Sequence, residues 1–273
     1  MLNKEIISKI KEKREFSQLP EIDIELAYEQ FSKRQASEEE KIKLTKELLR
    51  KLFSAFVSKK LLSLKEKEPE WILRKHISTR ERMNVQRSSK NGQTEERLPY
   101  YFEIYKRILK GNKKASVIDL GAGINGFSYS FFKKTGTNVK YTAIESVGQL
   151  VELMNFYFKN NKLNGEAVHL SLFELEKVKK IINEEEKPKI VFLFKVIDAL
   201  EDLKRDYSKT LISELSKITD KMVVSFATKS LGNRKSFKAK RNWILDFIKD
   251  NFNVLDDFEI GGERYIVFGK NKA

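Results

Sequence analysis

The 273-residue sequence predicts an α/β fold whose mostly parallel sheet ends in an antiparallel hairpin and follows a helical N-terminal region. From residue 115 onward, short apolar runs alternate with segments long enough for helices, which is typical of a parallel sheet. Before about residue 110, apolar residues instead recur at helical spacing. We therefore expect a helical domain over residues 1–97 and an α/β domain over residues 98–273.

The N-terminal helices are indicated by their first turns and their apolar faces. Ser37 followed by Glu40 forms a capping box for a helix with one apolar face. Pro99 suits the first turn of a further helix that runs to about residue 109. Shorter helices are expected over residues 4–15, 22–34 and 69–77, and an exposed, mobile loop over residues 84–96.

The α/β domain contains seven short apolar runs, which are the expected strands. The last two are separated only by Gly261-Gly262, a hairpin signal, so five parallel strands should be followed by an antiparallel pair. The expected strands are residues 116–120, 139–145, 167–170, 190–194, 222–226, 253–260 and 264–268.

Composition excludes several classes of protein. There is no cysteine, which rules out disulfides, thiolate metal sites and cysteine nucleophiles and suits a reducing, cytoplasmic location. No apolar run approaches the roughly 20 residues that span a bilayer, and the charged N-terminus lacks the apolar stretch of a secretory signal. We expect neither a membrane partner nor a bound metal.

The charge balance favours a polyanionic partner such as nucleic acid. Lys and Arg number 54 against 39 acidic residues, which gives a formal charge of +15 and a pI near 9.6. The excess is concentrated in residues 74–90 and 227–241. These segments could follow phosphate groups, or they could be solvated charge runs.

A glycine-rich turn directly follows the first strand. Gly121-Ala122-Gly123 would let the backbone turn sharply and approach a ligand closely. Asn125 and Gly126 break the GxGxxG pattern, which disfavours a dinucleotide site.

Two further strand ends carry polar side chains that could serve a nucleoside. Glu145 closes the second strand, where a carboxylate can accept both hydroxyls of an adenosine ribose; the alternative is a solvated strand end. Ser171 and Leu172 follow the third strand, and the Ser171 hydroxyl can form a hydrogen bond but carries no charge. His169 is expected to be a half-buried strand residue.

Four segments, in this order, resemble one family. They are HISTRER (76–82), VIDLGAGINGF (117–127), FLFKVIDALE (192–201) and VVSFATKSLGNR (223–234). Together they resemble the aminoglycoside-resistance methyltransferases of small-subunit (16S) ribosomal RNA, guanine-N7 type, in bacterial or archaeal form. The resemblance covers roughly residues 70–270. Its specificity lies in the order of the four blocks.

The resemblance implies a Rossmann-like class I methyltransferase fold, S-adenosyl-L-methionine as cofactor and small-subunit ribosomal RNA as partner. The target would lie in the aminoglycoside-binding decoding region, with the helical domain recognising RNA. The sequence departs from the family at Gly126 and Asp198, where proline is usual, at Ser171, which replaces an acid, and in the insertion-like stretch 83–95.

Several site residues follow from the same resemblance. His76 with Arg80 or Arg82 would lie over the cofactor, an arginine pairing with its carboxylate; alternatively, this segment only caps a helix. Lys195 follows the fourth strand, at the ligand-facing edge of the sheet, where it could orient the target or simply extend to water. The sequence identifies no partner for its charge.

The segment after the fifth strand resembles the target-facing loop of the family, with basic residues suited to phosphate contacts. Phe226, Phe237 or Trp243 could stack on an extruded base, or belong to the core. The predicted site therefore comprises Lys195 as catalytic residue; His76, Arg80, Arg82, Gly121, Ala122, Gly123, Asn125, Glu145, Ser171 and Leu172 for the cofactor; and Lys229, Arg234, Lys235 and Lys238 for RNA.

Guanine N7 carries a lone pair and no proton, so its methylation needs alignment and no general base. The sequence shows no obvious acid–base pair, which agrees with this chemistry. Two alternatives stay open: methylation of another acceptor, such as tRNA, adenine N1 or a protein, and a non-catalytic RNA-binding or ribosome-assembly protein. We expect the protein to act as a monomer on a folded RNA surface.

Overall fold

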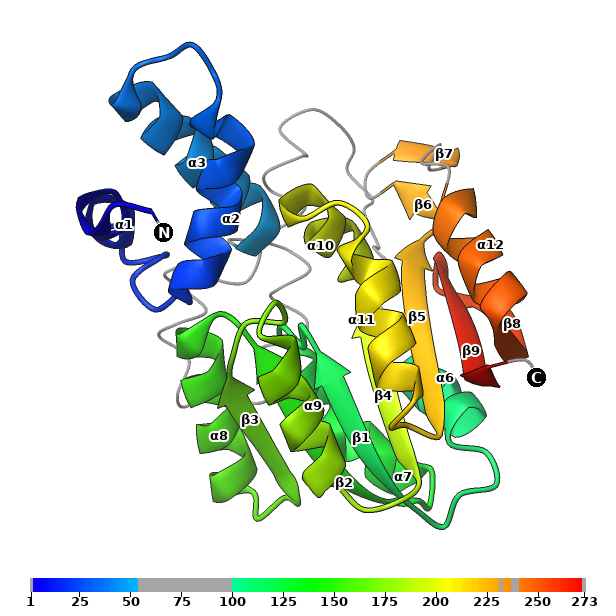
Figure 1. Ribbon diagram of the computed structural model, residues 1–273. Coiled ribbons are helices and arrows are strands. Elements are labelled where there is room, and N and C mark those ends of the chain that lie inside the picture. The colour runs from blue at the N-terminus through cyan, green and yellow to red at the C-terminus, as the bar shows by residue number, and fades with distance from the viewer. Residues whose placement is uncertain (1, 54–99, 231–232, 237–240, 272–273) are drawn as a thin grey trace.

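The computed structural model describes residues 2–53, 100–230, 233–236 and 241–271. Its centre is a seven-stranded sheet in the order β3-β2-β1-β4-β5-β9-β8 (Figure 1). The first five strands are parallel, and β9 runs antiparallel to both β5 and β8. This confirms the fold class expected from the sequence. The strands are β1 (Lys114–Leu120), β2 (Asn138–Glu145), β3 (Gly165–His169), β4 (Lys189–Phe194), β5 (Lys221–Ala227), β8 (Phe252–Ile260) and β9 (Glu263–Asn271).

Helices cover both faces of the sheet and form two separate apolar clusters. One cluster contains the buried faces of α6, α7 and α8, and the other those of α9, α11 and α12. A short 3-10 helix, η2, joins β1 to α7. These elements are α6 (Tyr101–Ile108), η2 (Asn125–Ser128), α7 (Tyr129–Lys134), α8 (Gly148–Asn160), α9 (Leu175–Glu184), α10 (Ile197–Leu203), α11 (Tyr207–Ser216) and α12 (Asn242–Asn251).

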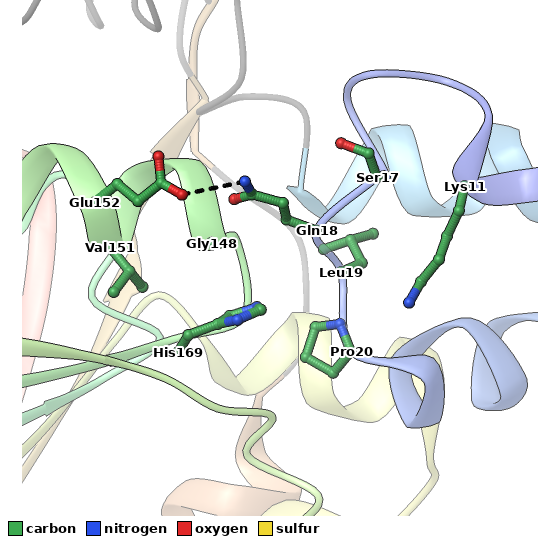
Figure 2. Close-up of a pocket in the computed structure, with 9 residues that line it drawn as sticks. All are labelled: Lys11, Ser17, Gln18, Leu19, Pro20, Gly148, Val151, Glu152 and His169. Carbon is green, nitrogen blue, oxygen red and sulfur yellow. Dashed lines mark hydrogen bonds between the residues drawn. The ribbon is translucent and has the colours of Figure 1, made fainter.

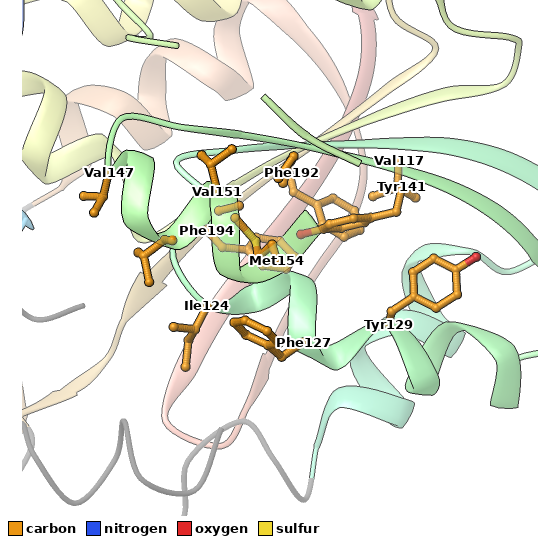
Figure 3. Packing of buried hydrophobic residues seen from close by; sticks show 14 of the residues in the cluster. Val117, Ile124, Phe127, Tyr129, Tyr141, Val147, Val151, Met154, Phe192 and Phe194 are labelled. Atoms are coloured by element: carbon orange, nitrogen blue, oxygen red, sulfur yellow. The ribbon is translucent and has the colours of Figure 1, made fainter. Parts of the chain in front are cut away.

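The first of these clusters is rich in aromatic rings. Figure 3 shows strand residues Tyr141 and Phe192 packed with Phe127 of η2 and Met154 of α8. The tyrosine and phenylalanine rings are almost completely buried. Such rings remove a large apolar area from water and fix how the sheet and helices meet. The turn after β1 is therefore held on a rigid support.

Three N-terminal helices lie over the carboxyl ends of the parallel strands (Figure 1). They are α1 (Lys4–Lys11), α2 (Glu21–Ser32) and α3 (Glu38–Phe53), and their buried side chains belong to the same cluster as α6–α8. The Gln30 side chain donates to the Leu203 carbonyl at 2.9 Å, and Lys51 pairs with Asp202 at 2.6 Å. The helical region thus packs directly against the edge of the sheet that carries the predicted site.

Two local predictions agree with the structure, whereas the helix expected over residues 4–15 ends at Lys11. The Glu40 amide donates to Ser37 Oγ at 3.2 Å, as the capping box requires. Gly261 and Gly262 both adopt positive φ in the terminal hairpin. A small antiparallel pair, β6 (Lys229–Ser230) with β7 (Asn233–Ser236), was not expected from the sequence. The helix predicted at 69–77, the loop at 84–96 and the boundary at residue 97 lie outside the described residues.

In the part of the chain that the structure describes, no helix combines the length and apolar character needed to cross a membrane.

Candidate cofactor site

The glycine-rich turn sits at the carboxyl end of β1, between β2 and β4. Gly121 and Gly123 adopt φ values of +67° and +57°, which L residues with a side chain rarely adopt. A Cβ atom on Gly121 would lie 2.6 Å from Val196 Cγ2, just after β4, and 3.8 Å from Leu172 Cδ1, after β3. Three strand ends therefore meet at Gly121, and only glycine fits there without displacement.

Glu145 is fixed beside this turn by two backbone hydrogen bonds. The Gly123 amide donates to Glu145 Oε2 at 2.7 Å, and the Val147 amide donates to Oε1 at 2.9 Å. Burial raises the pKa of this carboxyl to about 7, the two amides act in the opposite direction, and the charges of Asp23 and Asp119 raise it further. Each oxygen keeps a lone pair for a further donor. The arrangement can accept two neighbouring hydroxyls.

Asn125 supports the turn from below. Its amide nitrogen donates to Asp119 Oδ2 at 2.6 Å, its oxygen accepts from the Tyr105 hydroxyl at 3.3 Å, and the Tyr141 hydroxyl also donates to Asp119 Oδ2 at 2.7 Å. This network buries the Asn125 side chain within the domain. Ala122 is also buried, and its amide donates to the Ile144 carbonyl at 3.3 Å. Contact of Ala122 or Asn125 with a cofactor stays a prediction.

Gly126 has a local structural explanation. A Cβ atom at this position would lie 2.6 Å from Met154 Sδ and 3.1 Å from Phe158 Cζ. Both side chains come from α8, which packs closely against η2. The glycine permits this close packing.

The residues directly after β3 carry no acid, but Asp23, from helix α2, contacts Ser171 there. Ser171 Oγ donates to Asp23 Oδ1 at 2.5 Å and accepts from the Phe173 amide at 3.1 Å. Asp23 belongs to α2 and is only 1% exposed. The neighbouring Leu172 is buried, and its carbonyl accepts from the Tyr207 hydroxyl at 2.6 Å. Sequence reasoning missed Asp23, because its position in a helix gives no signal of this contact.

Lys195 lies at the carboxyl end of β4 with a strained backbone. Its φ is +57°, unusual for a residue with a side chain. Its ammonium lies 3.3 Å from Glu263 Oε2, and Glu263 in turn accepts from the Ser225 hydroxyl. Glu263 comes from β9 and is almost fully buried. The sequence identified no partner for the charge of Lys195, and the structure supplies one, Glu263, from a strand that pairs with β5 far along the chain.

The predicted RNA-binding residues are only partly within the described chain. Lys229 lies on β6, and Arg234 and Lys235 lie on β7. Lys238 lies outside the described residues, as do His76, Arg80 and Arg82 of the predicted cofactor site.

Arg241, at the end of the second basic segment, has a structural role. Its guanidinium binds both oxygens of Asp198, donates to the Ala227 carbonyl at 3.1 Å and lies over the Phe226 ring. Asp198, on α10, thus anchors Arg241 at the start of α12.

The aromatic residues considered for base stacking lie in different environments. Phe226 is buried in the core, whereas Trp243 is 36% exposed on α12 with the Lys209 ammonium 5.5 Å from its ring. Phe237 lies outside the described residues. Of the two that can be compared, only Trp243 lies at the surface.

A cavity of about 460 Å³ separates the N-terminal segment from the start of α8. Figure 2 shows Gln18 reaching Glu152 across it, and Leu19, Pro20 and His169 around it. His169 is exposed, not half-buried as expected, and its Nε2 lies 3.0 Å from the Ser146 carbonyl oxygen. Within the described ranges, no three His, Asp or Glu side chains gather as metal ligands would.

Sheet order, the turn after β1 and the terminal antiparallel pair define the class I S-adenosylmethionine-dependent methyltransferase fold. Among solved structures, the chain is similar to the 16S rRNA methyltransferase RmtF in complex with S-adenosyl-L-homocysteine, with 17% identity, 98% of this chain and 97% of that chain covered and a TM-score of 0.71. It is also similar to the 16S rRNA methylase RmtB (16% identity, 98% of each chain, TM-score 0.71). An rRNA methylase from Escherichia coli has 16% identity, with 98% and 99% of the two chains covered and a TM-score of 0.70.

No family model matches the sequence, and no curated protein is significantly similar to it.

Proposed function

We propose that this protein is an S-adenosylmethionine-dependent methyltransferase that modifies small-subunit ribosomal RNA, with guanine N7 in the decoding region as the acceptor. One observation carries the cofactor assignment: a buried carboxylate, Glu145, held by two backbone amides beside a turn of two positive-φ glycines. This geometry suits a ribose diol, whose two hydroxyls would donate to the two carboxylate oxygens.

The sides of this site also suit a nucleoside. Leu172 and Val196 bring apolar side chains to the glycine turn. The space beside Gly121 is filled by Val196, so a side chain at this position would disturb the apolar wall of the site. When bound, S-adenosylmethionine supplies an activated methyl group. The protein has to hold the acceptor in line with it.

Lys195 is our candidate for that task. Its side chain is 37% exposed at the carboxyl end of β4, and its ammonium lies 3.3 Å from the buried Glu263 carboxylate. An ammonium held there can donate to a phosphate oxygen or to O6 of a guanine whose N7 faces the methyl group. Because N7 carries no proton, positioning is sufficient, and it can lower the barrier by several kcal/mol.

The choice of RNA as substrate is supported by charge and by the fold comparisons. The chain carries a formal charge of +15. The similar structures RmtF and RmtB are named as enzymes of 16S rRNA, and they match this chain over nearly its whole length. The hairpin β6–β7 brings Lys229, Arg234 and Lys235 into one short structural unit after β5, and we assign phosphate contacts to it.

The decisive experiment has two parts. Calorimetry with S-adenosyl-L-homocysteine should show binding by the wild-type protein and weaker binding, by about tenfold or more, by Glu145→Ala. Incubation with labelled methyl donor and small ribosomal subunits should label 16S RNA, and mapping should find N7-methylguanine.

The outcomes separate the alternatives. Binding of the cofactor product with label only on tRNA, on adenine or on protein would replace the proposed acceptor. RNA binding without any cofactor binding would instead identify a non-catalytic RNA-binding protein.

A further inference from the structure

Asp23 is a buried acid that has no part in the proposed function as described so far. It lies in the first turn of α2, is 1% exposed, and accepts a hydrogen bond from Ser171 just after β3. The Ser146 hydroxyl, just after β2, stabilises the charged form of the same carboxyl. Burying a carboxylate is costly, so an acid placed at the ends of two parallel strands indicates a role in the site.

The location of Asp23 relates it to the nucleoside as well as to the helical region. Its charge acts on Glu145, the proposed ribose ligand, and raises the pKa of that carboxyl. Ser146 directly follows Glu145, and the Leu170 amide donates to the Glu145 carbonyl at 3.1 Å, so the segments after β2 and β3 that Asp23 touches both adjoin the proposed ribose ligand. Asp23 therefore lies next to the part of the site that would hold the nucleoside.

Ser171 is poorly suited to recognise the base itself. Its single hydroxyl proton goes to Asp23, and its oxygen already accepts from the Phe173 amide at 3.1 Å. The exocyclic amino group of adenine needs an acceptor, and a desolvated carboxylate is a stronger one than a neutral hydroxyl. Of the two side chains in this contact, Asp23 is the one with acceptor capacity to spare.

The second carboxylate oxygen of Asp23 supplies that capacity. Oδ1 takes the Ser171 proton, whereas Oδ2 is buried and has no partner that meets hydrogen-bond geometry in the described chain, although the Ser146 hydroxyl lies near enough to lower the pKa of the carboxyl. A buried oxygen without a donor costs free energy unless a ligand supplies one.

We propose that Asp23 accepts a hydrogen bond from the adenine amino group, so that helix α2 supplies the acid that the segment after β3 lacks. This inference rests on the proposed function. It makes the N-terminal region part of the cofactor site. Docking of α2, which Gln30 secures on the Leu203 carbonyl, would then be needed for full cofactor affinity.

A competing explanation is that Asp23 only ties α2 to the sheet. The two explanations differ in what a change at the base does. A tie between α2 and Ser171 would affect every nucleoside ligand equally, whereas an adenine acceptor would distinguish an amino group from a carbonyl oxygen.

The test compares two probes, S-adenosyl-L-homocysteine and S-inosyl-L-homocysteine, which carries a carbonyl oxygen in place of the amino group. Calorimetry on the full chain should show the wild type preferring the adenosyl probe by roughly 10- to 100-fold, as expected for a hydrogen bond to a charged group. Asp23→Ala should lose the preference. Asp23→Asn can keep its oxygen on Ser171 and turn its amide nitrogen to the base, so its preference should reverse.

Glu29→Gln, an exposed change on the same helix, is the matched control and should keep the wild-type preference. Circular dichroism checks that each variant is folded. If Asp23→Ala does not fold, the preference of Asp23→Asn between the two probes decides between the two explanations. Folded variants that keep the wild-type preference would overturn the role of Asp23, as would a wild type that binds both probes equally. A wild type that binds neither probe would overturn the proposed function itself.

Discussion

At the scale of single residues, the site holds two buried carboxyls whose protonation is coupled to stability. Burial raises the pKa of Asp23 to about 6 and that of Glu145 to about 7. Their unfolded values lie near 4, so between about pH 4 and pH 6–7 the folded protein binds protons that the unfolded chain has released. Their contribution to the free energy of unfolding therefore falls as pH rises through this window.

Asp23→Asn removes one of these carboxyls, so its stability relative to wild type should improve as pH rises. One pKa unit corresponds to about 1.4 kcal/mol, so the difference between the two proteins should change by roughly 2–3 kcal/mol from pH 4 to pH 7. Urea unfolding at both pH values measures it, with Glu29→Gln in parallel. A difference that is the same at pH 4 and pH 7 would contradict the assignment.

Lys195 and Glu263 allow a second prediction at this scale. Lys195→Ala should reduce methyl transfer about a hundredfold, because the acceptor loses its positioning group. It should also lower stability, because the buried Glu263 carboxylate loses the Lys195 ammonium. Glu263→Gln keeps an oxygen that can accept from Ser225 and from the Lys195 ammonium, so it should retain more of the activity than Lys195→Ala does.

The double variant Lys195→Ala/Glu263→Gln should recover stability but not activity. Turnover on saturating subunits and thermal melting measure the two effects separately. If Lys195→Ala stays within about twofold of wild-type turnover, Lys195 is only a strand end, and the β6–β7 hairpin becomes the candidate for placing the base.

At the scale of elements, the turn after β1 owes its shape to close packing between strand ends. Gly121 combines a φ of +67° with Val196 Cγ2 only 2.6 Å from the point where a Cβ atom would lie, whereas Gly111 has a φ of +84° with open space around it. A comparison of these two positions therefore separates the effect of backbone strain from the effect of crowding. Both demand a left-handed backbone, but only one lies at the site.

Gly111→Ala should cost about 1–2 kcal/mol of unfolding free energy, from backbone strain alone. Gly121→Ala should cost a further ~1–3 kcal/mol, because the methyl group displaces Val196. Only Gly121→Ala should weaken binding of S-adenosyl-L-homocysteine. Urea unfolding measures the stability of both variants, and calorimetry measures their affinity for S-adenosyl-L-homocysteine. Equal affinities in the two variants would show that the turn does not contact the ligand.

At the scale of the whole molecule, the charge of +15 predicts that affinity for RNA depends strongly on salt. Affinity for small subunits should fall linearly with the logarithm of salt concentration, because phosphate contacts release counterions. Arg234→Glu, Lys235→Glu and Lys238→Glu together should reduce RNA affinity by about tenfold or more and flatten this salt dependence. Cofactor affinity should change little.

Filter binding over a salt series measures the RNA affinity, and calorimetry the cofactor affinity. Lys177→Glu/Lys180→Glu on α9, which reverses two charges away from the hairpin (Figure 1), is the control. A triple variant that binds subunits as the wild type does would move the RNA-binding face elsewhere.

Local patterns in the sequence were sufficient for most of the fold. Apolar runs of strand length marked every strand of the main sheet, and Gly261-Gly262 marked the hairpin. The β6–β7 pair was missed because its strands are short and polar, so no alternation of apolar residues indicates them. The seven-stranded architecture depends on regular burial, which leaves a clear pattern in the sequence.

The sequence by itself determined which parts of the site lie near one another along two adjacent strands: Gly121, Gly123 and Glu145 meet because parallel strands place their carboxyl ends at one edge. Only the tertiary structure decided which distant side chains complete it. Asp23 reaches Ser171 from α2, and Glu263 reaches Lys195 from β9. Those contacts follow from how whole helices and strands dock, and docking depends on the packed core rather than on any neighbouring residue.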